Sequence, residues 1–190
     1  MTRVQQQSSH SYDLSLTGDI TIRRCTASDI GTIAELGARL FVEAYGPTHP
    51  EPDRTPYLAK AYSHEEIGAA INESGGGVLV VEDTQSGAIG YVHLRPSPAP
   101  PEGVKGNQVY EIVRFYVAAS HQGRGIGRTL MDRACEEVKR TGGDAIWLQV
   151  WSEADWAVGF YHKVGYDIVG KAPFHFGKRV DRDYVMARAI

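Results

Sequence analysis

An alternating run of β-branched, aromatic and charged residues occupies positions 109–117. A period of two residues is typical of a β-strand, whose side chains point to opposite faces in turn. Strict alternation assigns Val109, Glu111, Val113, Phe115 and Val117 to one face, and Tyr110, Ile112, Arg114 and Tyr116 to the other. The run is therefore predicted to form a strand that stops at Ala118.

The spacing of apolar residues changes after a glycine-rich bridge. Ile126, Leu130, Ala134 and Val138 recur every four residues, as expected for the buried stripe of an amphipathic helix. Between strand and helix lies Gln-Gly-Arg-Gly-Ile-Gly at positions 122–127. The region is predicted to be a strand, a glycine turn and a helix in succession.

The same two periods predict further elements on both sides of this unit. Strands are expected at residues 20–25, 78–82, 88–94, 145–151, 166–171 and 184–189. Helices are expected from Ser28 or Asp29 to Tyr45, where Gly46 and Pro47 end the helix, from Ser63, with Glu66 completing a capping box, to about residue 72, and at residues 155–164. The proline-rich segments 46–56 and 96–106 are expected to be loops.

The order of these elements, β-α-α-β-β-β-α-β-α-β-β, predicts a single α/β domain at residues 19–190. The strand at 145–151 is nearly all apolar, as expected for a strand that is covered on both faces and runs parallel to the strand at 109–117. The expected sheet is mixed and largely antiparallel, with this central parallel pair flanked by helices. Residues 1–18 are rich in Gln and Ser and are predicted to be a flexible N-terminal segment.

Composition argues against several classes of protein for this chain of 190 residues. A net charge of −3 and the lack of a Lys/Arg run argue against a nucleic-acid-binding surface. Two cysteines are too few for a disulfide scaffold, and no Cys/His spacing indicates a metal site. No apolar run reaches membrane-spanning length and no secretory signal opens the chain, so a cytoplasmic protein without membrane partners is expected.

The glycine turn has the chemistry of an anion-binding loop. Gly123, Gly125 and Gly127 lack the Cβ atoms that would hold a ligand away from the backbone, and they permit positive φ, so successive N–H groups can converge on one anion. The N-terminus of the next helix adds free N–H groups and a positive dipole. Arg124 and Arg128 add charge at the rim. These features predict a site for a diphosphate.

Three known glycine-loop patterns compete for this segment. A nucleotide-triphosphate loop needs Gly-Lys-Ser/Thr, which does not follow here. A dinucleotide fingerprint has the spacing G-x-G-x-x-G, whereas the three glycines are spaced G-x-G-x-G. The third pattern, Gln/Arg-x-x-Gly-x-Gly/Ala after a strand, fits from Gln122 to Gly127. It resembles the acyl-coenzyme A loop of the GCN5-related N-acetyltransferases, the GNAT superfamily.

A second motif supports this resemblance. Residues 160–166, Phe-Tyr-His-Lys-Val-Gly-Tyr, resemble the aromatic-Tyr-x-x-x-Gly-aromatic signature that closes the coenzyme site of the family. A narrower likeness, to the bacterial branch that includes spermine/spermidine N-acetyltransferases, rests on Phe41, Tyr45, Tyr57, residues 111–117, Val150, Trp151 and residues 174–177. The chain departs from the family where Asn often precedes the Phe-Tyr helix, because Ala154 takes that place and Trp156 follows where a basic residue is common.

The resemblance implies acetyl-coenzyme A as cosubstrate, no metal, and a set of binding residues. In the family the strands on either side of the glycine loop splay apart and the acetylated pantetheine inserts between them. The backbone of Phe115, Tyr116 and Val117 is then expected to bind the pantetheine amides and to polarise the thioester carbonyl. The other expected coenzyme-binding positions are Gln122, Gly123, Arg124, Gly125, Ile126, Gly127, Arg128, Ala154 and Tyr161.

Direct transfer of an acetyl group to an amine needs two proton movements, because the ammonium must lose a proton and the thiolate leaves more readily when it gains one. By the resemblance, Tyr161 is the expected acid, and Glu111 is the expected base, directly or through water. Alternatives remain open: Tyr161 packs in the core, Glu111 pairs with Arg114 or another cation, or His175 is the base. Cys135 is expected in the core.

The predicted function is therefore acetyl transfer to a primary amine of a small molecule in a ternary complex, with polyamines favoured. Acceptor specificity is expected from the first two helices, the loop between them and residues 173–183. These regions hold Glu43, Glu51, Asp53, Glu65, Glu66, Asp181 and Asp183, interleaved with Tyr45, Tyr57, Tyr62, Phe174 and Phe176. The alternatives are an acyl-coenzyme A-binding module without catalysis, a transferase for a protein lysine, an N-terminus or an antibiotic amine, and, more distantly, a dinucleotide oxidoreductase. A homodimer is left open.

Overall fold

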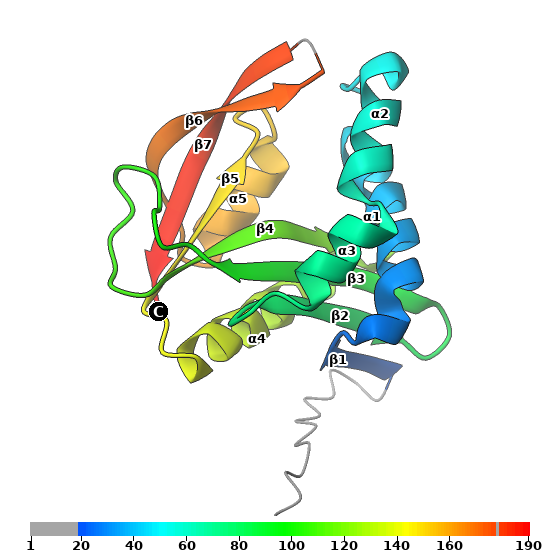
Figure 1. Cartoon of the computed structure of the whole chain (residues 1–190), viewed down its shortest axis with the longest axis horizontal. Helices are drawn as coiled ribbons and strands as arrows, with labels where there is room; N and C mark the ends of the chain where they lie inside the picture. The colour runs from blue at the N-terminus through cyan, green and yellow to red at the C-terminus, as the bar shows by residue number, and fades with distance from the viewer. Residues whose placement is uncertain (1–18, 178) are drawn as a thin grey trace, which may run out of the picture.

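The computed structural model describes residues 19–177 and 179–190, so the segment predicted to be flexible, residues 1–18, lies outside the described residues. The strands are β1 (Ile20–Arg24), β2 (Gly77–Asp83), β3 (Gly87–Pro96), β4 (Val109–Val117), β5 (Ala145–Val150), β6 (Asp167–Phe176) and β7 (Arg179–Ala189) (Figure 1). The helices are α1 (Ile30–Tyr45), α2 (Glu51–Ala61), α3 (His64–Ile71), α4 (Ile126–Arg140) and α5 (Asp155–Lys163). None of these helices is long and apolar enough to cross a membrane.

The strands form one seven-stranded sheet in the order β1-β2-β3-β4-β5-β7-β6. Strands β4 and β5 pair in parallel, and the other neighbouring pairs are antiparallel. The paired register of β4 and β5 ends at Ile112 and Leu148, although β4 continues to Val117 and β5 to Val150. The predicted mixed, largely antiparallel sheet with a splayed central parallel pair is confirmed.

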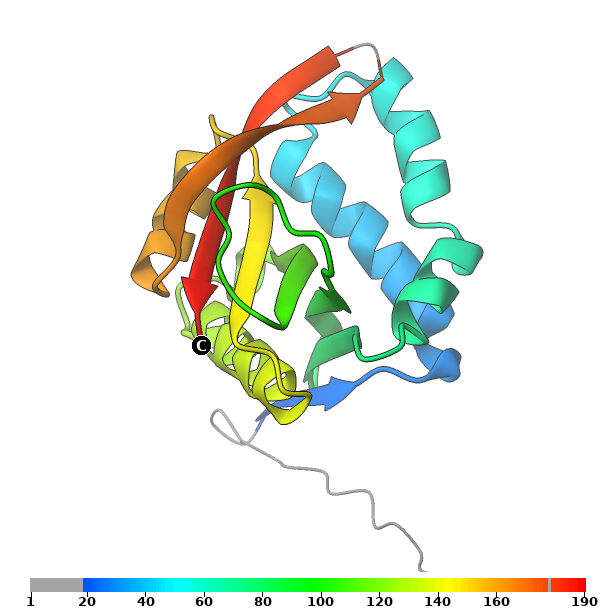
Figure 2. The same cartoon turned by 60° about the vertical axis from the view of Figure 1, so that its left-hand side comes forward.

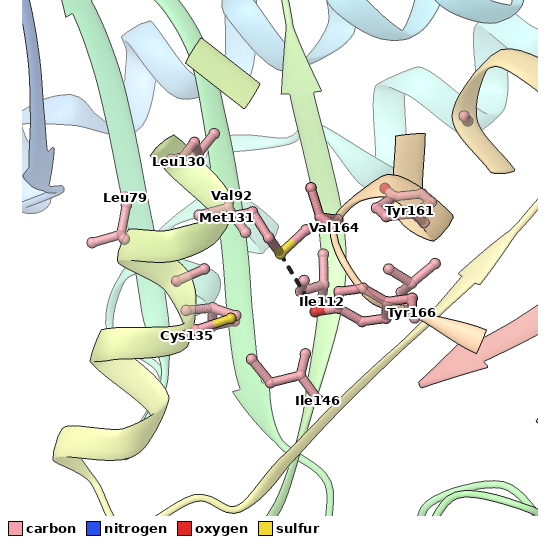
Figure 3. Close-up of a cluster of buried hydrophobic side chains, with 14 of the residues drawn as sticks. Leu79, Val92, Ile112, Leu130, Met131, Cys135, Ile146, Tyr161, Val164 and Tyr166 are labelled. Carbon is pink, nitrogen blue, oxygen red and sulfur yellow. Dashed lines mark hydrogen bonds between the residues drawn. The ribbon is translucent and has the colours of Figure 1, made fainter. Parts of the chain in front are cut away.

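Helices cover both faces of the sheet. On one face α4 and α5 pack over the central strands, where Leu130 and Met131 of α4 belong to one buried cluster with Tyr161 of α5 and Tyr166 (Figure 3). The Tyr166 hydroxyl donates to Met131 Sδ at 3.4 Å. On the other face α1 and α3 bury a second cluster of side chains, and α1, α2 and α3 lie together on one side of the molecule in Figures 1 and 2. The apolar residues whose spacing predicted α1, α3, α4 and α5 lie on the buried faces of these helices.

The predicted loop at residues 46–56 is wrong in its second half, because α2 begins at Glu51. Pro52 lies in the first turn, where a backbone N–H has no acceptor within the helix. The lack of an N–H in proline therefore costs no helical hydrogen bond there. The amides of Asp53 and Arg54 donate to the Pro50 carbonyl at 3.2 and 3.0 Å. Glu51 and Asp53 also place negative charge at the positive end of the helix dipole. Proline and acidic residues here mark a helix start.

Strict alternation along β4 is wrong beyond Ile112, because the strand contains a β-bulge. The register advances by two residues on β4 while it advances by one on β3, which leaves Val113 without its own partner on β3. One extra residue turns the following side chains to the opposite faces of the sheet. Phe115 therefore joins Ile112 in the cluster under α4 and α5, and Tyr116 joins the cluster under α1.

The last two strands are longer than predicted, since residues 173–183 belong mostly to the β6–β7 hairpin. The paired register runs from Asp167 and Ala187 to Phe176 and Arg179. Pro173 is tolerated because β6 is an edge strand. The hairpin extends beyond β5 and reaches α2 (Figure 2), where the ring of Tyr57 lies 5.1 Å from that of Phe176.

Candidate active site

A cavity of about 690 Å³ opens where β4 diverges from β5 and the N-terminus of α4 approaches α5. It is lined by the end of β4, the glycine loop, α5 and part of α1. The residues predicted to bind the coenzyme that line it are Phe115, Tyr116, Val117, Gln122, Gly123, Gly125, Gly127, Arg128 and Tyr161. The fold thus gathers most of that set, drawn from a strand, a loop and two helices, around one space.

The glycine loop has the backbone shape expected of an anion site. Gly125 is the N-cap of α4 with φ of 83°, and Gly123 has φ of 74°, a region that residues with a Cβ atom rarely adopt. A Cβ atom at either position would meet nothing within 4 Å. The first helical hydrogen bond runs from the Thr129 amide to the Gly125 carbonyl at 3.1 Å, so the preceding amides lack a helical acceptor. These N–H groups are available to an anion.

The neighbouring side chains support the loop in different ways. Gln122 Nε2 donates to the Val117 carbonyl at 2.9 Å and ties the loop to β4. Arg128 donates to the Lys163 carbonyl at 2.9 Å and ties α4 to the end of α5. A Cβ atom on Gly127 would stand 3.2 Å from the Phe160 ring. A side chain at position 127 would therefore crowd the packing of α4 against α5.

Three of the predicted coenzyme-binding residues do not line the cavity. Arg124 is an exposed residue of the loop, Ile126 is 2% exposed in the core, and Ala154 is fully buried at the N-cap of α5. Ala154 makes no side-chain cap hydrogen bond. The neighbouring Trp156, 57% exposed, lines the cavity instead.

Tyr161 projects from α5 into both the core and the cavity. It is 8% exposed, and its ring lies 6.3 Å from Phe115 and 5.8 Å from Tyr166. No hydrogen bond joins its hydroxyl to another described residue. Burial raises the pKa of Tyr161 well above its ordinary value. The hydroxyl is therefore a protonated donor at neutral pH.

A second cavity, of about 220 Å³, lies on the other face of the splayed strands beneath the β6–β7 hairpin. Tyr116 lines both cavities. The walls combine aromatic rings with polar and charged groups, and they include Tyr45, Tyr57, Trp151, Phe174, Glu111, Arg114, His49, Gln149, Asp181 and Asp183. A small molecule in this space can approach a group in the first cavity at Tyr116.

Glu111 lines the second cavity and is ion-paired there. Its Oε2 lies 2.6 Å from Arg95 Nη2 and 2.7 Å from Arg95 Nε. Arg114 has other partners, because it donates to the Ala61 carbonyl at 2.7 Å and its guanidinium lies 4.8 Å from the centre of the Tyr62 ring. Glu111 therefore pairs with Arg95 and not with Arg114. Pairing with another cation was one of the alternatives that the sequence left open.

Asp183 and Gln149 form a polar pair in the same wall. Gln149 Nε2 lies 3.3 Å from Asp183 Oδ2, and Asp183 is 5% exposed. Burial, with a smaller contribution from the charge of Asp181, raises the pKa of Asp183 to about 6 against the hydrogen bond from Gln149. Sequence reasoning missed Gln149, although it is the one polar residue of an otherwise apolar strand.

The remaining acceptor candidates are dispersed. His49, which sequence reasoning missed, is 4% exposed among rings that include Phe176 at 4.5 Å, and nothing in its proline-rich segment marked it. His175 is exposed on β6 and lines neither cavity. Glu43 lines the first cavity and accepts a hydrogen bond from the Ala119 amide. The acidic residues that line neither cavity are Glu51, Asp53, Glu65 and Glu66.

The first cavity fits coenzyme A on the chemistry of its walls. Its volume lies in the usual range of about 300–1,000 Å³ for small-molecule sites. Open space above Gly123 and Gly125 lets a diphosphate approach the backbone. Apolar walls from Phe115 and Phe160 lead away from the loop towards Tyr161. In the described part of the chain, no group of three or more His, Cys, Asp or Glu side chains is placed to hold a metal ion.

Comparison with known proteins gives a consistent result. The model of the acetyltransferase (GNAT) family matches residues 38–166. The N-alpha-acetyltransferase RimI of Mycobacterium tuberculosis is 32% identical over 154 residues, which are 81% of this chain and 82% of that protein.

Solved structures share the fold. The PaiA N-acetyltransferase from Thermoplasma acidophilum, in complex with coenzyme A, has a TM-score of 0.71 at 20% identity and covers 90% of this chain and 99% of its own. The spermidine/spermine N-acetyltransferase SpeG from Vibrio cholerae has a TM-score of 0.63 at 23% identity and covers 91% and 95%. The chain belongs to the acetyltransferase (GNAT) family and is an acetyl-coenzyme A-dependent acetyltransferase.

Proposed function

We propose that this acetyltransferase acts on a primary amine of a small molecule, with polyamine-like amines as the favoured acceptors. The observation that carries the proposal is the second cavity, which meets the coenzyme cavity at Tyr116 and combines carboxylates with aromatic rings. Carboxylates bind ammonium groups by charge-assisted hydrogen bonds, and aromatic faces attract the same cations.

The coenzyme is held by the glycine loop and by the end of β4. The amides of the loop and of the first turn of α4 bind the diphosphate, and Arg128 adds positive charge at the cavity wall. The paired register of β4 with β5 stops at Ile112, so backbone groups of residues 115–117 can bind the pantetheine arm as a neighbouring strand would. Acetyl-coenzyme A supplies the acetyl thioester when bound.

Tyr161 is the proposed acid of the reaction. Its hydroxyl is protonated at neutral pH because burial raises its pKa, and it lines the coenzyme cavity with no hydrogen bond to another described residue. A hydroxyl in this state can deliver its proton to the departing sulfur. The aromatic contacts with Phe115 and Tyr166 hold the ring in place.

Glu111 is the proposed base, directly or through a water molecule. Its side chain is 13% exposed and lines the second cavity, here called the acceptor cavity. Glu111 pairs with Arg95 two residues before the bulge at Val113. Arg95 holds the carboxylate against the wall through its two contacts. A carboxylate held in this way can accept a proton from the acceptor nitrogen without a change of rotamer.

The enclosure of the second cavity supports a small acceptor. Tyr57 of α2 contacts Phe174 and Phe176 of β6, with ring centres 6.3 and 5.1 Å apart, so the hairpin and α2 meet above the cavity. The space holds about seven water-sized groups at roughly 30 Å³ each. SpeG, a spermidine/spermine N-acetyltransferase, shares the fold, whereas RimI is an N-alpha-acetyltransferase and makes a protein N-terminus the second candidate.

The test is a thiol-release assay over a panel of amines at fixed acetyl-coenzyme A. The panel holds spermidine, spermine, simple alkyl diamines, amino acids, an aminoglycoside and a short peptide with a free N-terminus. Spermidine or another polyamine is expected to release thiol fastest. Turnover of the peptide or the antibiotic with none of the polyamines would contradict the acceptor assignment, and coenzyme A binding without thiol release from any amine would favour a non-catalytic module.

A further inference from the structure

The acceptor cavity contains one carboxylate whose charge has no cationic partner among the described residues. Of its three acidic side chains, Glu111 is paired with Arg95, and Asp181 has an interaction of its own. Asp183 has only the neutral amide of Gln149, at 3.3 Å from Oδ2, and Oδ1 is buried with no hydrogen-bond partner among the described residues. A carboxylate that is 5% exposed is costly to ionise in this state.

On this basis we propose that Asp183 is the anionic group that binds the ammonium of the acceptor. The inference rests on the proposed amine acetylation and names the residue that selects a cation. An ammonium has three N–H donors, so it can satisfy Oδ1 of Asp183 and still contact neighbouring groups. The bound ammonium then compensates the negative charge of the ionised Asp183.

The walls around Asp183 suit an alkylammonium. Tyr45, Trp151 and Phe174 line the same cavity, and the rings of Tyr45 and Trp151 meet edge to face with centres 6.4 Å apart. Aromatic faces attract organic cations and also accept the apolar carbons that carry the nitrogen. A hydrated inorganic ion has no such apolar part.

The other charged groups of the cavity do not neutralise Asp183. Arg114 lines the cavity, but its guanidinium donates to the Ala61 carbonyl and lies over the Tyr62 ring. Arg95 binds Glu111. The neighbouring carboxylate of Asp181 adds negative charge and raises the pKa of Asp183, as burial does more strongly, to about 6.

The remaining titratable neighbours are His49 and three tyrosines. His49 precedes α2 by two residues, packs among aromatic rings and is hydrogen-bonded to Thr48 Oγ1 at 3.0 Å through Nδ1. Burial raises the pKa of Tyr45, Tyr57 and Tyr116, so all three hydroxyls are neutral where Asp183 titrates. Asp183 is therefore expected to contribute to the pH dependence of acceptor affinity near pH 6, and the Asp183→Asn variant separates its contribution from that of the other groups in the cavity.

The test measures binding directly and needs no turnover. Spermidine and butylamine are titrated by calorimetry into the protein saturated with coenzyme A, for the wild type, Asp183→Asn, and Asp167→Asn as the matched control. Asp167 is an exposed residue of the same hairpin. Asp183→Asn is expected to lower the affinity for both amines at least about tenfold, the scale of a charged hydrogen bond. Asp167→Asn is expected to bind both amines as the wild type does, and the affinity for coenzyme A should be the same in all three proteins.

Two further measurements distinguish an effect of the charge of Asp183 from an effect of its shape. Butanol, a neutral analogue, is expected to show no difference between the wild type and Asp183→Asn. Amine affinity of the wild type is expected to fall about tenfold between pH 7.5 and pH 5 as Asp183 gains its proton, with a flat profile in Asp183→Asn. The amines stay cationic throughout this range.

The outcomes are distinguishable from a failure of the proposed function. Amine binding that depends on Asp183 supports the inference even where the thiol-release assay detects no product. Equal amine affinity in the wild type and Asp183→Asn, or absence of amine binding to the wild type, would overturn the inference. A loss of affinity for butanol as large as that for butylamine would also overturn it.

Discussion

Replacement of the buried Asp183 by Asn should increase the stability of the protein, and more so at higher pH. The folded-state pKa of about 6 exceeds the ordinary value of 3.8, so the folded protein binds the proton more tightly than the unfolded chain does. Below the ordinary pKa both states are protonated and the group has no effect. As pH rises towards 6, ionisation lowers the free energy of unfolding, and above that value the cost is constant.

The magnitude follows from the difference between these two pKa values. Each unit corresponds to about 1.4 kcal/mol, so the ionised carboxylate costs about 3 kcal/mol near pH 7.5 and about 1.6 kcal/mol near pH 5. Asn has nearly the same shape and can still accept the hydrogen bond from Gln149. Asp183→Asn is therefore expected to be more stable than the wild type, with a gap that widens between these pH values.

Urea unfolding of the two proteins at several pH values would measure this gap. Because other titrating groups act equally in both proteins, the difference isolates Asp183. Asp167→Asn, at an exposed site, should leave the free energy of unfolding unchanged. If Asp183→Asn proves less stable by the same amount at every pH, the carboxylate serves the structure through its hydrogen bond and the desolvation argument is wrong.

Three further predictions concern the coenzyme site and the chemistry. Gly125→Val should abolish coenzyme A binding, because φ of 83° strains a β-branched residue and the side chain would enter the cavity; calorimetry measures the loss, and tight binding would contradict it. Tyr161→Phe should lower kcat by roughly tenfold to a thousandfold with unchanged coenzyme A affinity; an unchanged kcat in steady-state assays would leave Tyr161 as a packing residue. Glu111→Gln should flatten the basic rise of the pH–rate profile, and a profile identical to that of the wild type would assign the base elsewhere.

The local residue pattern was sufficient to predict most helices, strands and turns, because these elements depend on residues that are close together in the sequence. The capping box at Ser63 and Glu66 marks the start of α3, where Ser63 Oγ accepts the Glu66 amide at 3.2 Å. The glycine spacing predicted the turn before α4, since only glycine adopts positive φ without strain. The apolar strand at 145–151 predicted its parallel pairing with β4, because such a strand must be covered on both faces.

The β-bulge at Val113 was outside the reach of the sequence. The alternation of residue types along β4 gives no sign of the extra residue of a bulge. The register with β3 reveals that the side chains change faces after Ile112. The consequence concerns function, because Glu111 and Arg114 would stand on opposite faces in a regular strand but line one cavity here. Two prolines in α2 were likewise misinterpreted, since their cost depends on their position in the helix.

The sequence by itself determined the element types, the anion-binding loop and the family to which the chain belongs. Tertiary structure decided which polar groups share a cavity and what each of them has for a partner. Glu111 meets Arg95 across a strand pair, whereas the side-chain partner of Asp183 among the described residues is the neutral amide of Gln149. A carboxylate has the same symbol in a sequence whether it is solvated, paired or buried, and its charge, pKa and binding role follow from neighbours that only folding brings near.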